Sequence, residues 1–80
     1  MPIVDIVVPV EIGDEEGVVV TWFKRQGDTI EKGEVLLTLQ VVKASLDIEV
    51  PFSGRVVAIL AQQDEVVKKG QVLAQLEVDG

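Results

Sequence analysis

The sequence predicts an all-β fold, a flattened β-sandwich or barrel with approximate two-fold symmetry. Valine and isoleucine are abundant, and Gly and Pro punctuate the apolar runs, a composition that favours strands over helices. The chain has 80 residues, of which 48% are hydrophobic, so it can bury one core and is expected to form one domain, residues 1–80. The third observation is an internal repeat that divides the chain into two similar halves.

The repeat is defined by matching segments at constant offsets. GVVV at residues 17–20 matches GRVV at 54–57, and KGEVLLTL at 32–39 matches KGQVLAQL at 69–76, both at an offset of 37 (54 − 17 and 69 − 32). Upstream, VDIVVP at 4–9 resembles LDIEVP at 46–51, at an offset of 42 (51 − 9). The first half therefore holds five extra residues (42 − 37). They lie within residues 10–16, an acidic insertion that contains Glu11, Asp14, Glu15 and Glu16.

Each half is predicted to form a strand, a turn, a second strand, a short strand, a turn and a final strand. The turns are predicted at pairs that contain glycine: Gly27-Asp28, Lys32-Gly33, Ser53-Gly54 and Lys69-Gly70. Two such halves, each with one apolar face, can bury those faces against each other.

The segment 35–50 joins the two halves and is predicted to form a β-hairpin with a two-residue turn at Lys43-Ala44. This turn places apolar pairs on one face and polar pairs on the other. The apolar pairs are Val41 with Leu46, Leu39 with Ile48, and Leu37 with Val50; the polar pairs are Gln40 with Asp47 and Thr38 with Glu49. A slip of one residue would mix the two faces, so the alternation favours this register.

The predicted tip of this hairpin has unusual chemistry. Lys-Ala is not the Asn-Gly or Asp-Gly pair that a tight hairpin prefers, and Val42 falls on the polar face beside the lysine. A single lysine on a turn is ordinarily a solubilising charge, and the chain has seven basic residues. The position of Lys43 at the exposed junction of a duplicated fold weakens that interpretation.

Composition excludes several classes of function. The chain has no cysteine for disulfides or thiol catalysis and no histidine for general base catalysis. Its net charge of −7 disfavours nucleic acid and anionic membranes as partners. No run approaches the ~18 apolar residues of a membrane span, and residues 1–5 lack the blocks of a signal peptide.

Three further features are interpreted as structural. The carboxylates of residues 11–16 lack the spacing of a calcium loop, so a solvated or partner-facing surface is expected there and no metal site. Gly27 and Gly33 are interpreted as turns, since no helix or Gly-Lys-Ser/Thr sequence follows them. Trp22, the sole tryptophan, is expected to pack in the core or at its rim rather than to bind a ligand.

An ordered set of residues carries a family resemblance over nearly the whole chain. The set is Glu16-Gly17, Trp22, Gly27-Asp28, Gly33, Lys43-Ala44, Pro51, Gly54 and Gly70. With it the chain resembles the lipoyl domains of 2-oxo acid dehydrogenase complexes, members of the biotinyl/lipoyl-attachment family found in the acyltransferase component. The resemblance implies a barrel-sandwich hybrid of two four-stranded antiparallel sheets. It also implies that lipoate is joined as an amide to Lys43, as N6-lipoyllysine, at a hairpin tip.

The resemblance implies a carrier without catalytic residues of its own. Its lipoyl group would act as a swinging arm that moves acyl groups and reducing equivalents between active sites. The implied partners are a lipoate ligase or lipoyl transferase, a thiamin-dependent 2-oxo acid decarboxylase, an acyltransferase catalytic domain and dihydrolipoamide dehydrogenase. By the same resemblance, the insertion lies near the lysine, and partner enzymes recognise Val42, Ala44, Gly13, Asp14, Glu15 and Glu16. A monomeric isolated domain is expected, in the bacterial cytoplasm or the mitochondrial matrix.

One position departs from the family pattern, and two alternative functions stay open. The family usually has an acidic residue directly before the lysine, where this chain has Val42. One alternative is a biotin carrier domain of a carboxylase, but such domains generally flank the lysine with methionine, and the only methionine here is Met1. The other is a lipoyl-like interaction module that is never modified. An aminomethyl carrier of glycine cleavage is disfavoured because such proteins are usually longer.

Overall fold

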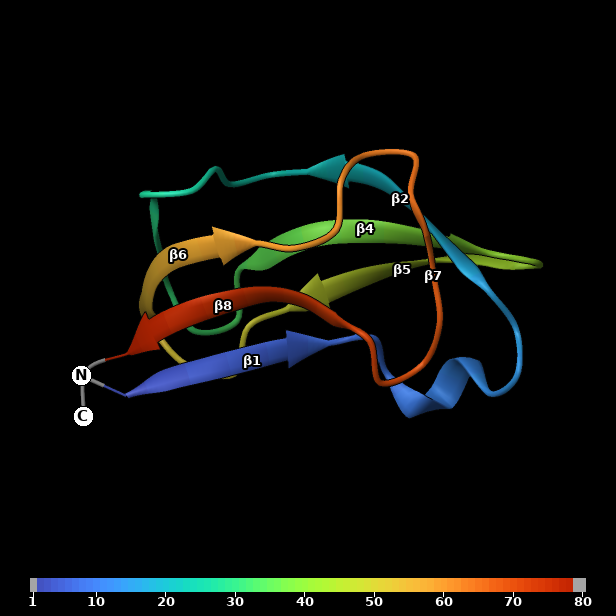
Figure 1. Cartoon of the computed structure of the whole chain (residues 1–80), viewed down its shortest axis with the longest axis horizontal. Helices are drawn as coiled ribbons and strands as arrows, with labels where there is room; N and C mark the ends of the chain where they lie inside the picture. The colour runs from blue at the N-terminus through green and yellow to red at the C-terminus, as the bar shows by residue number, and fades with distance from the viewer. Residues whose placement is uncertain (1, 79–80) are drawn as a thin grey trace.

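The computed structural model describes residues 2–78, which form two four-stranded antiparallel sheets (Figure 1). The elements in chain order are β1 (Ile3–Val7), the 3₁₀ helix η1 (Val10–Ile12), β2 (Gly17–Trp22), β3 (Thr29–Ile30), β4 (Val35–Val41), β5 (Ala44–Glu49), β6 (Gly54–Ile59), β7 (Val66–Val67) and β8 (Val72–Val78). One sheet has the order β1-β8-β6-β3 and the other β5-β4-β2-β7. The predicted fold class, an all-β barrel-sandwich, is confirmed. Within the described residues the only helix is η1, which is far too short to cross a membrane.

The two sheets are related by the internal repeat. Adding four to the strand number, or subtracting four, converts the first sheet order into the second. The strands β2, β3 and β4 begin and end 37 residues before β6, β7 and β8. Nine residues (8–16) separate β1 from β2, whereas four (50–53) separate β5 from β6, so the insertion has five residues (9 − 4), as predicted.

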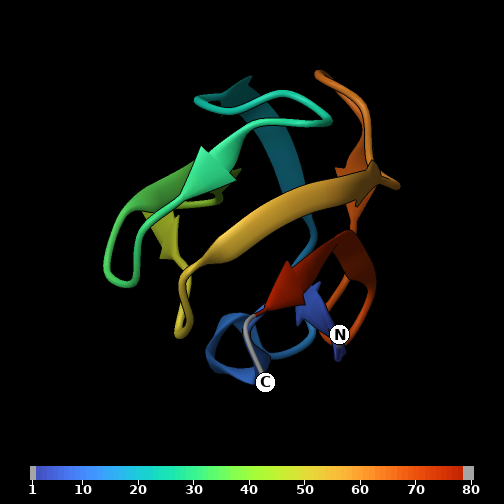
Figure 2. The same ribbon diagram turned by 90° about the vertical axis from the view of Figure 1, so that its left-hand side faces the viewer.

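The core lies between the sheets and is made mainly of inward-facing residues of the long strands. Leu37, Leu39 and Leu76 have no exposed surface, and each contributes about 1.5–3 kcal/mol by leaving water. Val19 and Val56, equivalent in the repeat, are also fully buried, and a β-bulge follows each of them. Figure 2, viewed along the molecule from the end where β1 begins, shows the strands of both sheets surrounding this core.

Trp22 packs against the rim of the core and is partly buried, as predicted. Its indole Nε1 is buried without a hydrogen-bond partner among the described residues. The side chain therefore stabilises the fold through the apolar area that it buries, which is large for aromatic residues.

The predicted register of the hairpin is wrong by two residues. Val41 pairs with Ala44 and Gln40 with Ser45, so Val42-Lys43 forms the turn instead of Lys43-Ala44. Because side chains alternate with a period of two, a shift of two residues leaves every side chain on its predicted face, and alternation cannot detect it. The observed register allows cross-strand hydrogen bonds, such as the Thr38 hydroxyl donating to the Asp47 carboxylate over 2.9 Å.

The molecule is elongated, with extents of 35 × 19 × 19 Å. The β4–β5 turn lies at one end of the long axis, and the start of β1 and the end of β8 lie at the other (Figure 1). The repeat explains this arrangement, because the antiparallel pair β4–β5 is equivalent to the pair β8–β1. The chain is continuous at the tip of the first pair, whereas β1 begins and β8 ends at the second.

Candidate functional site

Lys43 occupies the second position of the β4–β5 turn, at one tip of the molecule. Its side chain is exposed and makes no hydrogen bond or ion pair with the rest of the described chain. Val42 beside it is 71% exposed, and Ala44, the first residue of β5, is exposed as well. The arrangement presents a primary amine on a four-carbon stem, which is free to be acylated by an enzyme that reaches the tip.

The turn is not of the type that two-residue hairpins usually adopt. The only non-glycine residue with a positive φ in the described chain is Asp64, so Val42 and Lys43 both have negative φ. Two-residue hairpins usually take the mirror-image turns, which need positive φ and therefore select Gly or Asn. Beneath this turn lies the Gln40 side chain, which hydrogen-bonds to both strands. Sequence reasoning did not single out Gln40, although the unfavourable turn residues were a clue that something else supports the tip.

The acidic insertion begins with η1 and lies at the same end of the molecule as the hairpin tip (Figure 1). Ile12 is buried in the core, which anchors the insertion, while Val10 is 74% exposed. A Cβ atom added to Gly17 would lie 3.6 Å from Cγ1 of Val41, so the end of the insertion adjoins the last residue of β4. Glu16 therefore directly precedes, in the chain, the residue that adjoins the last residue before the lysine-bearing turn.

The predicted recognition residues of the insertion also lie beside the turn between β7 and β8. Gly13, Asp14, Glu15 and Glu16 line a cavity of about 370 Å³ together with Lys68 and Lys69. The Asp14 carboxylate lies 3.5 Å from Nζ of Lys69, and its side chain is otherwise fully exposed. The structure thus brings Glu16 close to the hairpin and places Asp14 against the turn between β7 and β8. The assignment of these residues to partner recognition stays a prediction.

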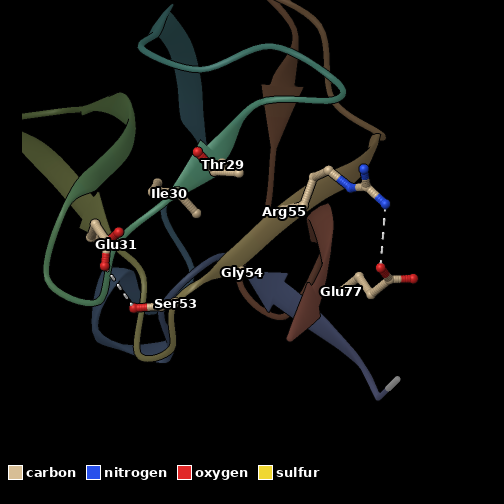
Figure 3. A pocket seen from close by; sticks show the side chains of 7 residues that line it. All are labelled: Thr29, Ile30, Glu31, Ser53, Gly54, Arg55 and Glu77. Atoms are coloured by element: carbon tan, nitrogen blue, oxygen red, sulfur yellow. Dashed lines mark hydrogen bonds and ion pairs between the residues drawn. The ribbon is translucent and has the colours of Figure 1, made fainter. Parts of the chain in front are cut away.

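A second cavity lies away from the lysine, near the end where β8 finishes. It has a volume of about 340 Å³, and Figure 3 shows its lining: Thr29, Ile30, Glu31, Ser53, Gly54, Arg55 and Glu77. An Arg55–Glu77 ion pair of 3.4 Å and a 3.2 Å hydrogen bond from the Ser53 hydroxyl to Glu31 cross it. Gly54 pairs with Val78, at the opposite end of the sheets from the tip, so this cavity is not part of the site around Lys43. Residues 2–78 contain no group of His, Cys, Asp or Glu side chains placed to hold a metal ion.

Comparisons with known sequences agree on one family. The biotin/lipoyl family model, described as "Biotin-requiring enzyme", matches residues 4–76. The chain is 39% identical over 70 residues to the dihydrolipoyllysine-residue acetyltransferase component of pyruvate dehydrogenase complex from Pseudomonas aeruginosa. It is 38% identical over 68 residues to the component of the same name from Corynebacterium glutamicum. These alignments cover 88% and 82% of this chain, which spans only 13% and 10% of the length of those relatives.

Two solved structures share the fold. The lipoyl domain of the 2-oxoglutarate dehydrogenase complex from Azotobacter vinelandii is 25% identical, with a TM-score of 0.78, over 96% of this chain and 99% of that one. A single-chain, multi-domain long-chain acyl-CoA carboxylase matches with a TM-score of 0.81 and 20% identity, over 98% of this chain and 7% of the carboxylase. The first likeness extends over a whole domain, and the second shows the fold alone.

Proposed function

Because this chain belongs to the biotin/lipoyl-attachment family, we propose that it carries a covalent lipoyl group on Lys43. The observation that carries the proposal is the exposed, unpartnered lysine in the turn of the hairpin that joins the two repeated halves. The relatives named for a dihydrolipoyllysine residue, and the solved lipoyl domain that matches along its whole length, favour lipoate as the group.

The described residues suit such a group. The Nζ amine of Lys43 would form an amide with the lipoyl carboxyl group, and this bond would remove the positive charge of the side chain. When bound, lipoate supplies a dithiolane that accepts an acyl group and two electrons, chemistry that a chain without cysteine cannot supply itself. The hairpin holds the base of the arm at the tip of a 35 Å domain, so that the arm moves while its attachment point does not.

The proposed partners are those that the family resemblance implies, and the relatives named as components of pyruvate dehydrogenase complex support them in part. We propose that a lipoate ligase or lipoyl transferase loads Lys43, and that the arm then visits a thiamin-dependent 2-oxo acid decarboxylase, an acyltransferase catalytic domain and dihydrolipoamide dehydrogenase. Tethering the arm would raise its effective concentration at each active site. Val42 and Ala44 are proposed to contact these enzymes because they flank Lys43, and the insertion residues Gly13–Glu16 because the insertion lies at the same end of the molecule. The bacterial cytoplasm or the mitochondrial matrix is the proposed location.

A biotin carrier is the second candidate, because the matching family model is described as "Biotin-requiring enzyme". The flanking residues Val42 and Ala44, in place of methionines, disfavour it. The experiment that separates the two is co-expression of the domain with a lipoate ligase or with a biotin ligase, followed by intact mass measurement. We expect one lipoyl adduct, absent in Lys43→Ala. A biotin adduct would favour the carboxylase function, and an unmodified product with several ligases of both kinds would leave the interaction module.

A further inference from the structure

We infer that Gln40 is a positioning residue that holds the lysine-bearing turn in one conformation for the enzyme that modifies Lys43. Gln40 lies on β4, three residues before the lysine, and it has no part in the family resemblance. The inference rests on the proposed attachment of lipoate at Lys43.

The Gln40 carboxamide is bonded on both sides of the turn. Its Nε2 donates to the carbonyl oxygen of Val41 over 2.9 Å and to that of Ala44 over 3.2 Å. Its Oε1 accepts a hydrogen bond of 2.9 Å from the Ser45 hydroxyl. One side chain therefore connects the last residue of β4 with the first two residues of β5, directly beneath Val42 and Lys43.

The turn needs such support because its own two residues have little conformational preference for a two-residue hairpin turn. Val42 is β-branched, and neither turn residue has the positive φ that matches a two-residue turn to the twist of its strands. The carbonyl groups of Val41 and Ala44 flank the turn, and the carboxamide draws them toward a common donor. A side chain thus replaces the conformational preference that Asn-Gly would have provided.

The internal repeat offers a comparison within the same molecule. The pair Gln40–Ser45 is equivalent to the pair Glu77–Ile3 (77 − 40 = 37; 45 − 3 = 42), and both pairs have the same register. At the second pair no such bridge exists in the described residues, and Glu77 forms an ion pair with Arg55 instead.

The next pair on the same face of the hairpin, by contrast, forms a side-chain hydrogen bond in both halves. Thr38 donates to Asp47 over 2.9 Å, and its equivalent Gln75 donates to Asp5 over 2.9 Å. The cross-strand bond one step below the tip therefore belongs to the fold, whereas the Gln40 bridge belongs only to the half that carries the lysine.

Loss of the bridge would spread the turn over several conformations. If the modifying enzyme binds one of them, its apparent affinity falls in proportion to the fraction of molecules in that conformation. The chemical step on a bound domain would be unaffected. The signature of a positioning role is consequently a higher KM for the domain with an unchanged kcat.

The test compares Gln40→Met with Gln75→Met, because methionine keeps the length of glutamine without its hydrogen bonds. The rate of lipoyl addition by a lipoate ligase is measured by intact mass over a range of domain concentrations. We expect KM to rise about 3- to 10-fold for Gln40→Met, as for the loss of one or two net hydrogen bonds, and less than about 2-fold for Gln75→Met. Ser45→Ala, which removes one of the three bonds, should give an intermediate rise.

A second readout does not depend on modification. In the unmodified domain, ¹⁵N relaxation order parameters of Val42 and Lys43 should fall in Gln40→Met from about 0.85 toward 0.6 or lower and stay unchanged in Gln75→Met. Unchanged order parameters and KM in Gln40→Met would overturn the inference, as would an equal rise in KM for both variants. If no ligase modifies the wild-type domain, the proposed function fails, and the order parameters still decide whether Gln40 holds the turn.

Discussion

Val41 pairs directly with Ala44 across the hairpin, which leaves Val42 and Lys43 as the two residues of the turn. The lysine therefore projects from the turn itself and not from the first position of a strand. Position 42 shares this turn, whereas position 44 is already the first residue of β5. The register thus makes the two neighbours of the lysine inequivalent, although both are one residue away.

Moving the lysine within the tip should reveal this inequivalence. The double variant Val42→Lys with Lys43→Val keeps an amine in the turn, and Lys43→Ala with Ala44→Lys moves it onto the strand. Since small misplacements of a reacting group cost up to about a hundredfold in rate, we expect modification to fall about tenfold at position 42 and about a hundredfold at position 44. Intact mass over time with a lipoate ligase measures both. Equal rates at all three positions would mean that the enzyme does not distinguish the turn from the strand.

Gly17 and Gly54 are equivalent in the repeat but differ in their need for glycine. A Cβ atom on Gly54 would overlap the carbonyl oxygen of Glu77 and lie 3.1 Å from its carbon, both backbone atoms of β8. A Cβ atom on Gly17 would lie at least 3.6 Å from its neighbours. We expect Gly54→Ala to lower the free energy of unfolding by about 1–3 kcal/mol and Gly17→Ala by less than about 1 kcal/mol. Urea unfolding of the two variants tests this, and equal losses would contradict the asymmetry.

Glu34 should make the stability of the domain depend on pH. The backbone N–H of Glu31, at 2.8 Å, and then the Lys24 amine, at 3.3 Å, hold the pKa of the Glu34 carboxyl below its ordinary value. A carboxyl group whose pKa is lower when folded adds stability at neutral pH, and this contribution is lost as the pH falls below about 4.5 and through the folded pKa. The equivalent residue, Gln71, caps its own turn without a charge, so Glu34→Gln should fold normally.

The measurement is urea unfolding of the wild type and of Glu34→Gln at pH 7 and at pH 3. The wild type should be the more stable at pH 7, and the difference should shrink at pH 3, which lies below the ordinary pKa of 4.5 for this carboxyl group. Both charged side chains are partly exposed, so the difference at pH 7 should also shrink in 1 M salt. A difference that is the same at both pH values would show that the charge of Glu34 does not contribute.

Much of the fold could be predicted because similar sequence segments occur in both halves of the chain. Strands β2 and β6 begin with the matching segments GVVV and GRVV, and the 37-residue offset fits the bounds of three strand pairs. The turn at Gly27 was predicted from its glycine, whereas its equivalent at Asp64 was not, although Asp64 also has a positive φ of 70°. Aspartate can adopt a positive φ but does not require one, so its presence in the sequence did not predict the second turn.

The sequence singled out Lys43 as the candidate site but did not indicate which residues support its turn. Lys43 stood out because it lies between the repeats. The alternation assigned the paired residues of β4 and β5 to the correct faces, whereas Val42, predicted on the polar face of a strand, lies in the turn. The exact turn and the Gln40 bridge depend on hydrogen bonds between side chains and backbone carbonyls, and these follow from the register that alternation cannot choose. The contact of Asp14 with Lys69 joins residues 55 apart and has no counterpart in any local pattern.

The acidic insertion should affect recognition by partner enzymes more than attachment of lipoate to the lysine. Glu16 is exposed and precedes Gly17, which adjoins Val41, the last residue of β4. Glu49, at the far end of β5, is also an exposed carboxylate. We expect Glu16→Lys to lower kcat/KM for acyl loading by a thiamin-dependent decarboxylase about 3- to 10-fold at low salt, with little effect at 0.5 M salt, because the effect is electrostatic. Glu49→Lys should change it by less than 2-fold, and both should be within about 0.5 kcal/mol of the wild type in stability. If the two variants reduce acyl loading equally, the net charge of the domain guides the encounter and the insertion has no special part in recognition.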